Sequence, residues 1–193
     1  MRLPPIILAS ASPRRCDLLR ELKLEFQVLP ANTMELDSQE MQARELCQLN
    51  AYHKARAVAK KHPDSLVLGA DTVVCLGSRI YGKPADLDDA HRILAELQGR
   101  THEVVTGVCL LHLRDHRQRM FVETTLVTFR QLHAEQIKQY LSRINPLDKA
   151  GAYAIQEEGD EIVKQISGSY TNVVGLPLER LRQELDEIAA WFW

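Results

Sequence analysis

One segment limits the choice of fold more than any other: SLVLGADTVVCL, residues 65–76. Its residues are β-branched or apolar on both sides of a single aspartate, Asp71, which is typical of a strand inside a sheet. Burying an unpaired charge is strongly unfavourable, so the Asp71 carboxylate must meet a cation, a metal ion or a cleft. The alternative is that Gly69-Ala70-Asp71 interrupts the strand and the aspartate caps a turn. Because catalytic carboxylates often lie in clefts, the functional interpretation is favoured.

Strands and helices alternate on both sides of this segment. Apolar and alternating runs predict further strands at 6–9, 25–30, 102–113 and 120–132, the last two joined as a hairpin. Helical spacing predicts helices starting at Ser12-Pro13 and at Pro177, and over 38–61, 86–97 and 133–144. Residues 148–177 are rich in glycine and small polar residues around short strands. Because one strand pair is a hairpin, we expect an α/β fold with a mixed, twisted sheet flanked by helices.

Composition limits the class of protein. The 193 residues, 45% of them hydrophobic, suffice for one domain, 1–193, or two lobes that share a core. The net charge of −2 argues against general binding to nucleic acid or to an anionic membrane. The four scattered cysteines have no metal-ligand spacing, and the N-terminus does not resemble a signal peptide, so we expect a cytoplasmic protein. The C-terminal AAWFW is interpreted as part of the last helix's core face, with a homodimer surface as the alternative.

The segment SASPRR, residues 10–15, could bind an anion. Its small residues permit close approach of the backbone, the helix start offers free N–H groups, and Arg14 and Arg15 add positive charge. These features suit a polyphosphate, although the segment taken alone slightly favours an ordinary helix cap with two solvated arginines. The chain has neither GxxxxGK[ST] nor GxGxxG, so neither a P-loop nor a dinucleotide fingerprint is present. The GSY sequence lacks the context of a serine nucleophile.

Several motifs together, in a fixed order, resemble those of a known family. The chain carries SASPRRCDLL, GADTVV, GKP, LQGRTHEVVTGV, TFRQL, PLDKAGAYAIQ and GSYTNVVGLPL. This succession, from about residue 6 to residue 181, resembles the Maf family of nucleoside-triphosphate pyrophosphatases. The resemblance implies a fold like that of the inosine-triphosphate pyrophosphatases, a long twisted mixed sheet with a cleft between two lobes. It also implies hydrolysis of a nucleotide to the monophosphate and pyrophosphate with a divalent metal ion.

The resemblance assigns roles to particular residues. It implies that Asp71 of the GAD motif is the proton acceptor. Three positions separate family members that prefer dTTP and UTP from those that prefer 7-methyl-GTP, and here they are Arg14, Thr72 and Gln156, as in the dTTP/UTP group. The resemblance implies that members of the methyl-GTP group instead carry tryptophan, glutamine and glutamate at these positions.

The chain departs from the family pattern after the second strand. The family usually has an acidic pair there, whereas Met34 precedes Glu35 in this chain, and Asp37 lies near but out of register. This departure weakens the expected metal ligation from the loop, although Glu35 aligns with the second acid.

These residues support one mechanistic hypothesis. Asp71 orients and deprotonates the water that attacks the α-phosphorus, and Gln156 pairs with the uracil or thymine edge through its amide. A Mg²⁺ or Mn²⁺ ion lies between the phosphates and the carboxylates of Glu35 and Asp71. The groups expected to bind the triphosphate are Ser10, Ser12, Arg14, Arg15, Lys54 and Lys83.

Three alternatives stay open. The first is the same chemistry on another base, such as 7-methyl-GTP or inosine triphosphate. The second is a nucleotide-binding regulator of cell division without turnover. The third is a phosphatase that removes only the terminal phosphate. The products formed from a panel of nucleotides distinguish all three.

Overall fold

The computed structural model describes residues 3–36 and 40–192. Seven strands form one mixed sheet: β1 (Ile6–Leu8), β2 (Phe26–Val28), β3 (Leu66–Leu76), β4 (Arg79–Tyr81), β5 (Thr101–His112), β6 (Arg117–Phe129) and β7 (Val163–Ser167). Their order is β2-β1-β3-β5-β6-β7, and β4 also pairs with β3. The pairs β1–β2 and β1–β3 are parallel and the others antiparallel. The expected α/β fold with a mixed sheet is therefore confirmed.

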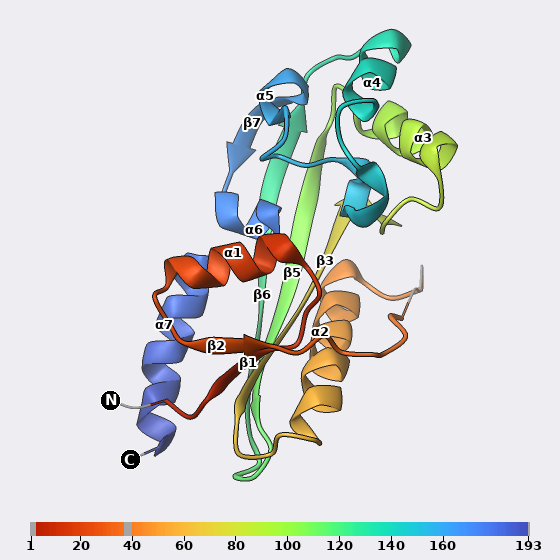
Figure 1. The fold of residues 1–193 in the computed structure, drawn as a ribbon. Helices are drawn as coiled ribbons and strands as arrows, with labels where there is room; N and C mark the ends of the chain where they lie inside the picture. Colours follow the sequence, from red (N-terminus) through yellow and green to blue (C-terminus); the bar gives the residue numbers. More distant parts are fainter. Residues whose placement is uncertain (1–2, 37–39, 193) are drawn as a thin grey trace.

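The helices flank this sheet on both faces (Figure 1). They are α1 (Pro13–Glu21), α2 (Ala43–Ala59), α3 (Leu87–Leu97), α4 (Ala134–Leu141), α5 (Gly159–Ile162), α6 (Tyr170–Val174) and α7 (Leu178–Ala189), with short 3₁₀ turns η1 (Pro146–Asp148), η2 (Ala150–Ala152) and η3 (Ala190–Phe192). The predicted start of α1 is confirmed, since the Ser12 hydroxyl accepts the backbone N–H of Arg15 at 3.4 Å.

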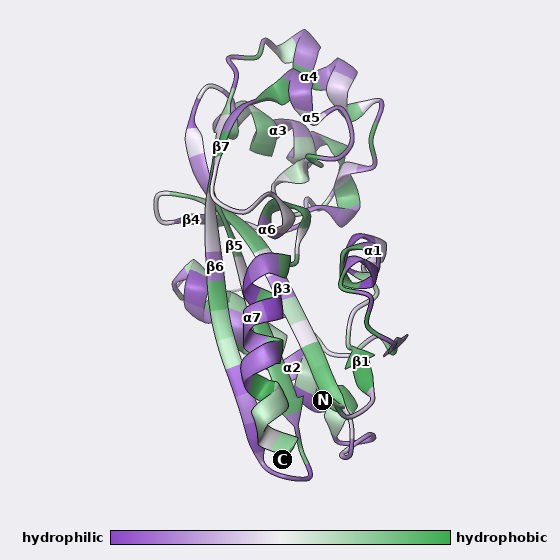
Figure 2. Cartoon of the chain, turned by 90° about the vertical axis from the view of Figure 1, so that its left-hand side faces the viewer, coloured by the Kyte–Doolittle hydropathy of each residue, from purple (hydrophilic) through white to green (hydrophobic). Residues whose placement is uncertain are grey.

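Two groups of elements lie at opposite ends of the long strands β3, β5 and β6 (Figure 1). We call β1, β2, α1, α2 and α7 the first lobe, and β4, β7, α3, α4, α5, η1 and η2 the second lobe. In the first lobe, α1 and α7 pack on the face of β3 that carries Leu66 and Leu68, and α2 packs on the opposite face against Val67. Figure 2 shows the long strands continuing from one lobe into the other.

The neighbour of β3 changes halfway along the strand. Its first three residues, Leu66–Leu68, pair with β1, and its last three, Val74–Leu76, pair with β4. Among the described residues, no strand pairs with positions 69–73 on that side, although β5 pairs with all of them on the other. The sheet therefore has a gap between the two lobes, and Asp71 and Thr72 lie at its edge.

Helix α2 approaches the sheet unusually closely, at two glycines. A Cβ atom added to Gly69 would lie 2.2 Å from the backbone oxygen of Ala51, and one added to Gly107 would lie 2.4–2.5 Å from the backbone of Cys47. Both contacts are to helix backbone, which cannot move aside as a flexible side chain could. These glycines therefore set the distance between α2 and strands β3 and β5.

Most elements agree with the sequence-based predictions, and the differences are local. The 102–113 and 120–132 hairpin is confirmed as β5 and β6, whereas the helix predicted over 38–61 begins only at Ala43. Strand β4 was missed because three residues after a turn give no usable periodicity. Residues 148–177 contain one strand, β7, between short helices rather than several strands.

The remaining expectations concern cysteines, the C-terminus and membrane spans. All four cysteines are free, and three of them are buried. Phe192 packs edge-on against His112 with 5.0 Å between ring centroids, as a core role for the C-terminus predicts. Asp37 and Trp193 lie outside the described residues. None of the helices in the described part of the chain combines the length and hydrophobicity needed to cross a bilayer.

We expect Gly107→Ala to lower the free energy of unfolding by about 1–3 kcal/mol, because the added methyl group would overpack the contact with the α2 backbone. Urea denaturation measures this loss. Gly159→Ala is the matched control, since its added Cβ would meet its nearest neighbour, a side-chain atom of Ile155, at an ordinary 3.4 Å. Equal stability of the Gly107 variant and the wild type would contradict the close approach of α2.

Candidate active site

Asp71 lies within the continuous strand β3, so the alternative that it caps a turn is wrong. Its side chain is 6% exposed and points toward α2. One carboxylate oxygen, Oδ1, accepts a hydrogen bond from Lys54 Nζ at 2.6 Å, and the other, Oδ2, accepts one from Asn50 Nδ2 at 3.2 Å. The prediction that this buried acid must meet a cation, a metal ion or a cleft is confirmed, because it meets the cation Lys54.

Lys54 lies between two carboxylates. Its Nζ is 2.6 Å from Asp71 Oδ1 and 2.7 Å from Oε1 of Glu35, which lies on the loop between β2 and α2. Burial by itself raises the pKa of Glu35, but the hydrogen bond and charge of Lys54 outweigh burial, so this pKa lies below its ordinary value. The two acids are therefore held within reach of one ammonium group.

Arg15 occupies the opposite face of β3. Its guanidinium donates to Gly175 O at 2.8 Å, Ala70 O at 2.9 Å, Thr72 Oγ1 at 2.9 Å and Ser10 Oγ at 3.4 Å. The Ala70 carbonyl lies at the edge left open by the gap in the sheet. Burial lowers the pKa of Arg15, yet a guanidinium stays charged at neutral pH. At least four of its five N–H groups donate to groups within the protein. Arg15 therefore contributes structure and positive charge to the site and leaves few free donors for a ligand.

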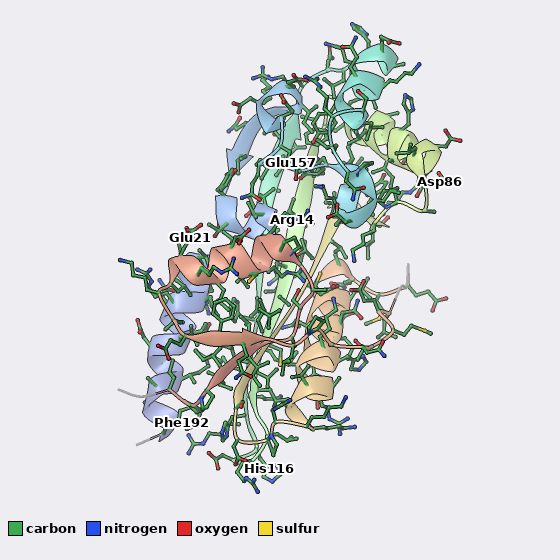
Figure 3. The ribbon with its side chains drawn as sticks, viewed as in Figure 1. Arg14, Glu21, Asp86, His116, Glu157 and Phe192 are labelled. Atoms are coloured by element: carbon green, nitrogen blue, oxygen red, sulfur yellow. The ribbon has the colours of Figure 1, made fainter. Side chains whose placement is uncertain are left out.

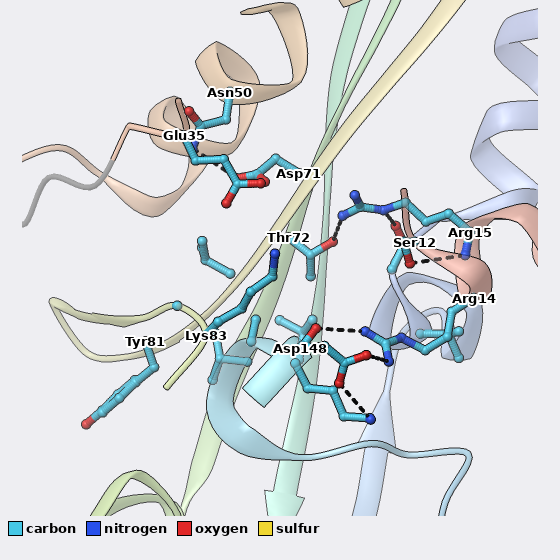
Figure 4. A pocket seen from close by; sticks show the side chains of 18 of the residues that line it. Ser12, Arg14, Arg15, Glu35, Asn50, Asp71, Thr72, Tyr81, Lys83 and Asp148 are labelled. Carbon is cyan, nitrogen blue, oxygen red and sulfur yellow. Dashed lines mark hydrogen bonds and ion pairs between the residues drawn. The ribbon is translucent and has the colours of Figure 1, made fainter. Parts of the chain in front are cut away.

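Arg14 connects the two lobes. It starts α1 in the first lobe, and its guanidinium contacts Asp148 of η1 in the second, with Nη1 3.2 Å from Oδ2 and Nη2 3.0 Å from the backbone oxygen. Lys149 holds the same carboxylate at 2.9 Å. Figure 4 shows this chain of contacts across the site. Unlike Arg15, Arg14 is therefore engaged by an acidic partner in the opposite lobe.

A cavity of about 930 Å³ opens at the gap in the sheet and is lined by residues of both lobes. It brings together every residue predicted for the site: Ser10, Ser12, Arg14, Arg15, Glu35, Lys54, Asp71, Thr72, Lys83 and Gln156. Figure 4 shows the Lys83 ammonium reaching from the loop after β4 toward Thr72. Gln156 is exposed at the cavity wall. Figure 3 shows Arg14 at the end of α1 that faces the second lobe.

Sequence analysis missed two parts of the site. Asn50 lines the cavity and contacts Asp71, and its spacing of four residues from Lys54, which puts both on one helix face, is the signal that could have found it. Asp148 was not among the predicted site residues, and its contact with Arg14 spans 134 residues of sequence. No local pattern predicts a contact of that range.

The residues present fit a divalent cation that also binds phosphate. Within the described residues, no group of three or more acidic, histidine or cysteine side chains could by itself hold a metal. Glu35 and Asp71 nevertheless supply two carboxylates on one side of the cavity. Mg²⁺ typically takes one or two carboxylates and completes its shell with substrate phosphates and water, so this donor set suits it.

The fold and the cavity define an α/β protein with a cleft between two lobes, in which acidic and cationic groups face one another. The model of the family described as "Maf-like protein" matches residues 5–188. A dTTP/UTP pyrophosphatase from Ruminiclostridium cellulolyticum is 45% identical over 185 residues, covering 95% of each chain. A second dTTP/UTP pyrophosphatase, from Acetivibrio thermocellus, is 46% identical and covers 94% of each chain. This chain belongs to the Maf family.

Among solved structures, a HAM1 protein from Coxiella burnetii superposes with a TM-score of 0.46 and 15% sequence identity, covering 66% of this chain and 73% of that one. The family assignment does not rest on this likeness.

Proposed function

We propose that this protein hydrolyses dTTP and UTP to the nucleoside monophosphate and pyrophosphate. Family membership and the names of relatives at 45–46% identity support this activity. The observation that carries it is the Asp71 carboxylate, buried at the edge of the sheet gap and facing a cavity lined by cations from both lobes. A carboxylate positioned beside bound phosphates suits the activation of a water molecule.

In the proposed reaction, Asp71 orients a water molecule and accepts its proton as the water oxygen attacks the α-phosphorus. The bond between the α-phosphorus and the oxygen bridging to the β-phosphorus breaks, and pyrophosphate leaves. Lys54 is placed to stabilise the ionised carboxylate at 2.6 Å. Since phosphoryl-group chemistry depends mainly on positioning and charge stabilisation, the protein needs no covalent intermediate.

The proposed phosphate site combines both lobes. Ser10 and Ser12 lie on the turn before α1, and Arg14 and Lys83 approach the cavity from opposite sides. Arg14 would exchange part of its contact with Asp148 for phosphate oxygens, whereas Arg15 would contribute mainly charge because its donors are used within the protein. Negative charge that develops on the leaving pyrophosphate would be stabilised by these cations.

We propose that Glu35 and Asp71 would hold a Mg²⁺ or Mn²⁺ ion together with the phosphates. Such an ion, when bound, neutralises phosphate charge and lowers the pKa of coordinated water. Lys54 contacts one oxygen of each carboxylate at 2.6 and 2.7 Å, so a bound cation would compete with its ammonium for these two groups. With Met34 in place of the first acid of the usual pair, Glu35 is the acid that residues 29–36 of this loop supply.

Base choice is assigned to Gln156, together with Arg14 and Thr72. The uracil or thymine edge has carbonyl acceptors on either side of an N3–H donor, and an amide offers both a donor and an acceptor. Thr72 is fixed by Arg15 at 2.9 Å and by Thr106 at 2.9 Å, so it presents a rigid wall to the cavity. We infer from the pairing of the amide with this edge that the site prefers a pyrimidine.

We expect Asp71→Asn to remain folded and to lose activity by ~10²-fold or more, because the general base is removed while the shape is kept. Pyrophosphate release from UTP and dTTP with Mg²⁺ or Mn²⁺ measures this loss. Asp64→Asn is the control, since its carboxylate pairs with Arg114 on the surface. Near-normal turnover in the Asp71 variant would remove this residue from the proposed role.

We expect Gln156→Glu to lower kcat/KM for UTP and dTTP relative to GTP analogues, by up to ~10⁴-fold in the most favourable case. A carboxylate only accepts hydrogen bonds, so it no longer matches the acceptors of the pyrimidine edge. Relative kcat/KM values over a nucleotide panel test this expectation. An unchanged preference would refute the assignment of Gln156. The same panel separates pyrophosphate release from removal of the terminal phosphate and from binding without turnover.

A further inference from the structure

We propose that Asn50 is a positioning residue: its side-chain amide fastens the loop that carries Glu35 to the carboxylate of Asp71. The inference rests on the proposed function, and it adds a residue that neither the family motifs nor the sequence patterns assign. Asn50 lies on α2, one turn before Lys54, and only 2% of its surface is exposed.

All three bonds of the amide join parts of the site. Oδ1 accepts the backbone N–H of Leu36 at 2.8 Å, while Nδ2 donates to the Leu36 carbonyl at 3.0 Å and to Asp71 Oδ2 at 3.2 Å. The amide orientation follows from chemistry, because the Leu36 N–H needs an acceptor and the two carbonyl-type partners need donors. Asn50 therefore makes the two hydrogen bonds to the Leu36 backbone that a neighbouring strand would otherwise make. Its remaining N–H donates to Asp71.

Asp71 is fixed at both oxygens as a result. Lys54 holds Oδ1 and Asn50 holds Oδ2, and both side chains come from the same face of α2. A carboxylate held at both ends cannot rotate freely about its terminal bond. The orientation of the Asp71 carboxylate relative to the cavity is therefore fixed before any substrate binds.

The loop depends on this amide because apolar burial holds it only weakly. Met34 is 91% exposed and Leu36 is 38% exposed. Between them lies Glu35, whose carboxylate contacts Lys54. The Leu36 backbone is thus anchored to α2 by Asn50 directly beside the residue that must lie near Asp71. Removing the amide frees the loop and one oxygen of the acid together.

The test compares Asn50→Leu, which keeps the branched shape with more bulk and removes every hydrogen bond, with Asn50→Asp. We expect the leucine variant to lose about 10- to 100-fold in kcat, the usual effect of removing a partner that orients a site's ligand. KM for UTP should change much less. The aspartate variant has no N–H donor for Asp71 or for the Leu36 carbonyl, so it should also lose kcat.

Val58→Ala controls for lost stability. Val58 is buried on the same helix outside the cavity, so its truncation weakens packing without touching the site. We expect this variant to melt at a lower temperature with an unchanged kcat. The inference would be overturned if Asn50→Leu or Asn50→Asp kept the wild-type kcat.

Hydrogen exchange at the Leu36 amide separates this inference from the proposed function. Loss of its acceptor should make this exchange at least several-fold faster in Asn50→Leu and leave it unchanged in Val58→Ala. A wild-type protein that released no pyrophosphate would refute the proposed function, whereas unchanged exchange at Leu36 would refute the fastening of the loop.

Discussion

The gap in the sheet beside β3 is the constraint on which the site depends. Strand β3 is paired with β1 at one end and β4 at the other, and its middle residues are open on that side. Successive strand residues point to opposite faces, so an open edge makes Asp71 on one face and Thr72 on the other accessible from the same cavity. A fully paired strand would have separated these two residues by a layer of backbone.

Helices α1 and α2 then supply a cation to each side of this edge. The close packing of α2 on Gly69 and Gly107 brings Lys54 and Asn50 onto the acid. Arg15 of α1 satisfies the open carbonyl of Ala70 and fixes Thr72. The same charges that make burial of Asp71 tolerable therefore also make the cavity attractive to a polyphosphate. Stability and the proposed chemistry depend on one set of contacts.

Much of this arrangement could be predicted from the sequence. The rest could not, because it depends on a strand too short to give a pattern and on contacts between residues far apart in the chain. Periodicity located the long strands, the hairpin and most helices, and the isolated Asp71 predicted a buried acid with a cation. The loop acid, Glu35, was singled out through the family resemblance, whereas Lys54 was expected to bind the triphosphate and was not predicted as the partner of Asp71. Strand β4 was too short to give a pattern, and the contact of Arg15 with Gly175 joins residues 160 positions apart. Such pairings depend on tertiary structure rather than on local propensity.

The central claim is that the carboxylate at this gap directs water to the α-phosphorus. Hydrolysis of UTP in ¹⁸O-labelled water, followed by mass spectrometry of both products, tests it most directly. The account predicts one labelled oxygen in UMP and none in pyrophosphate, because the water oxygen stays on the phosphorus that it attacks. Label in pyrophosphate, or in free phosphate released from the terminal position, would contradict it.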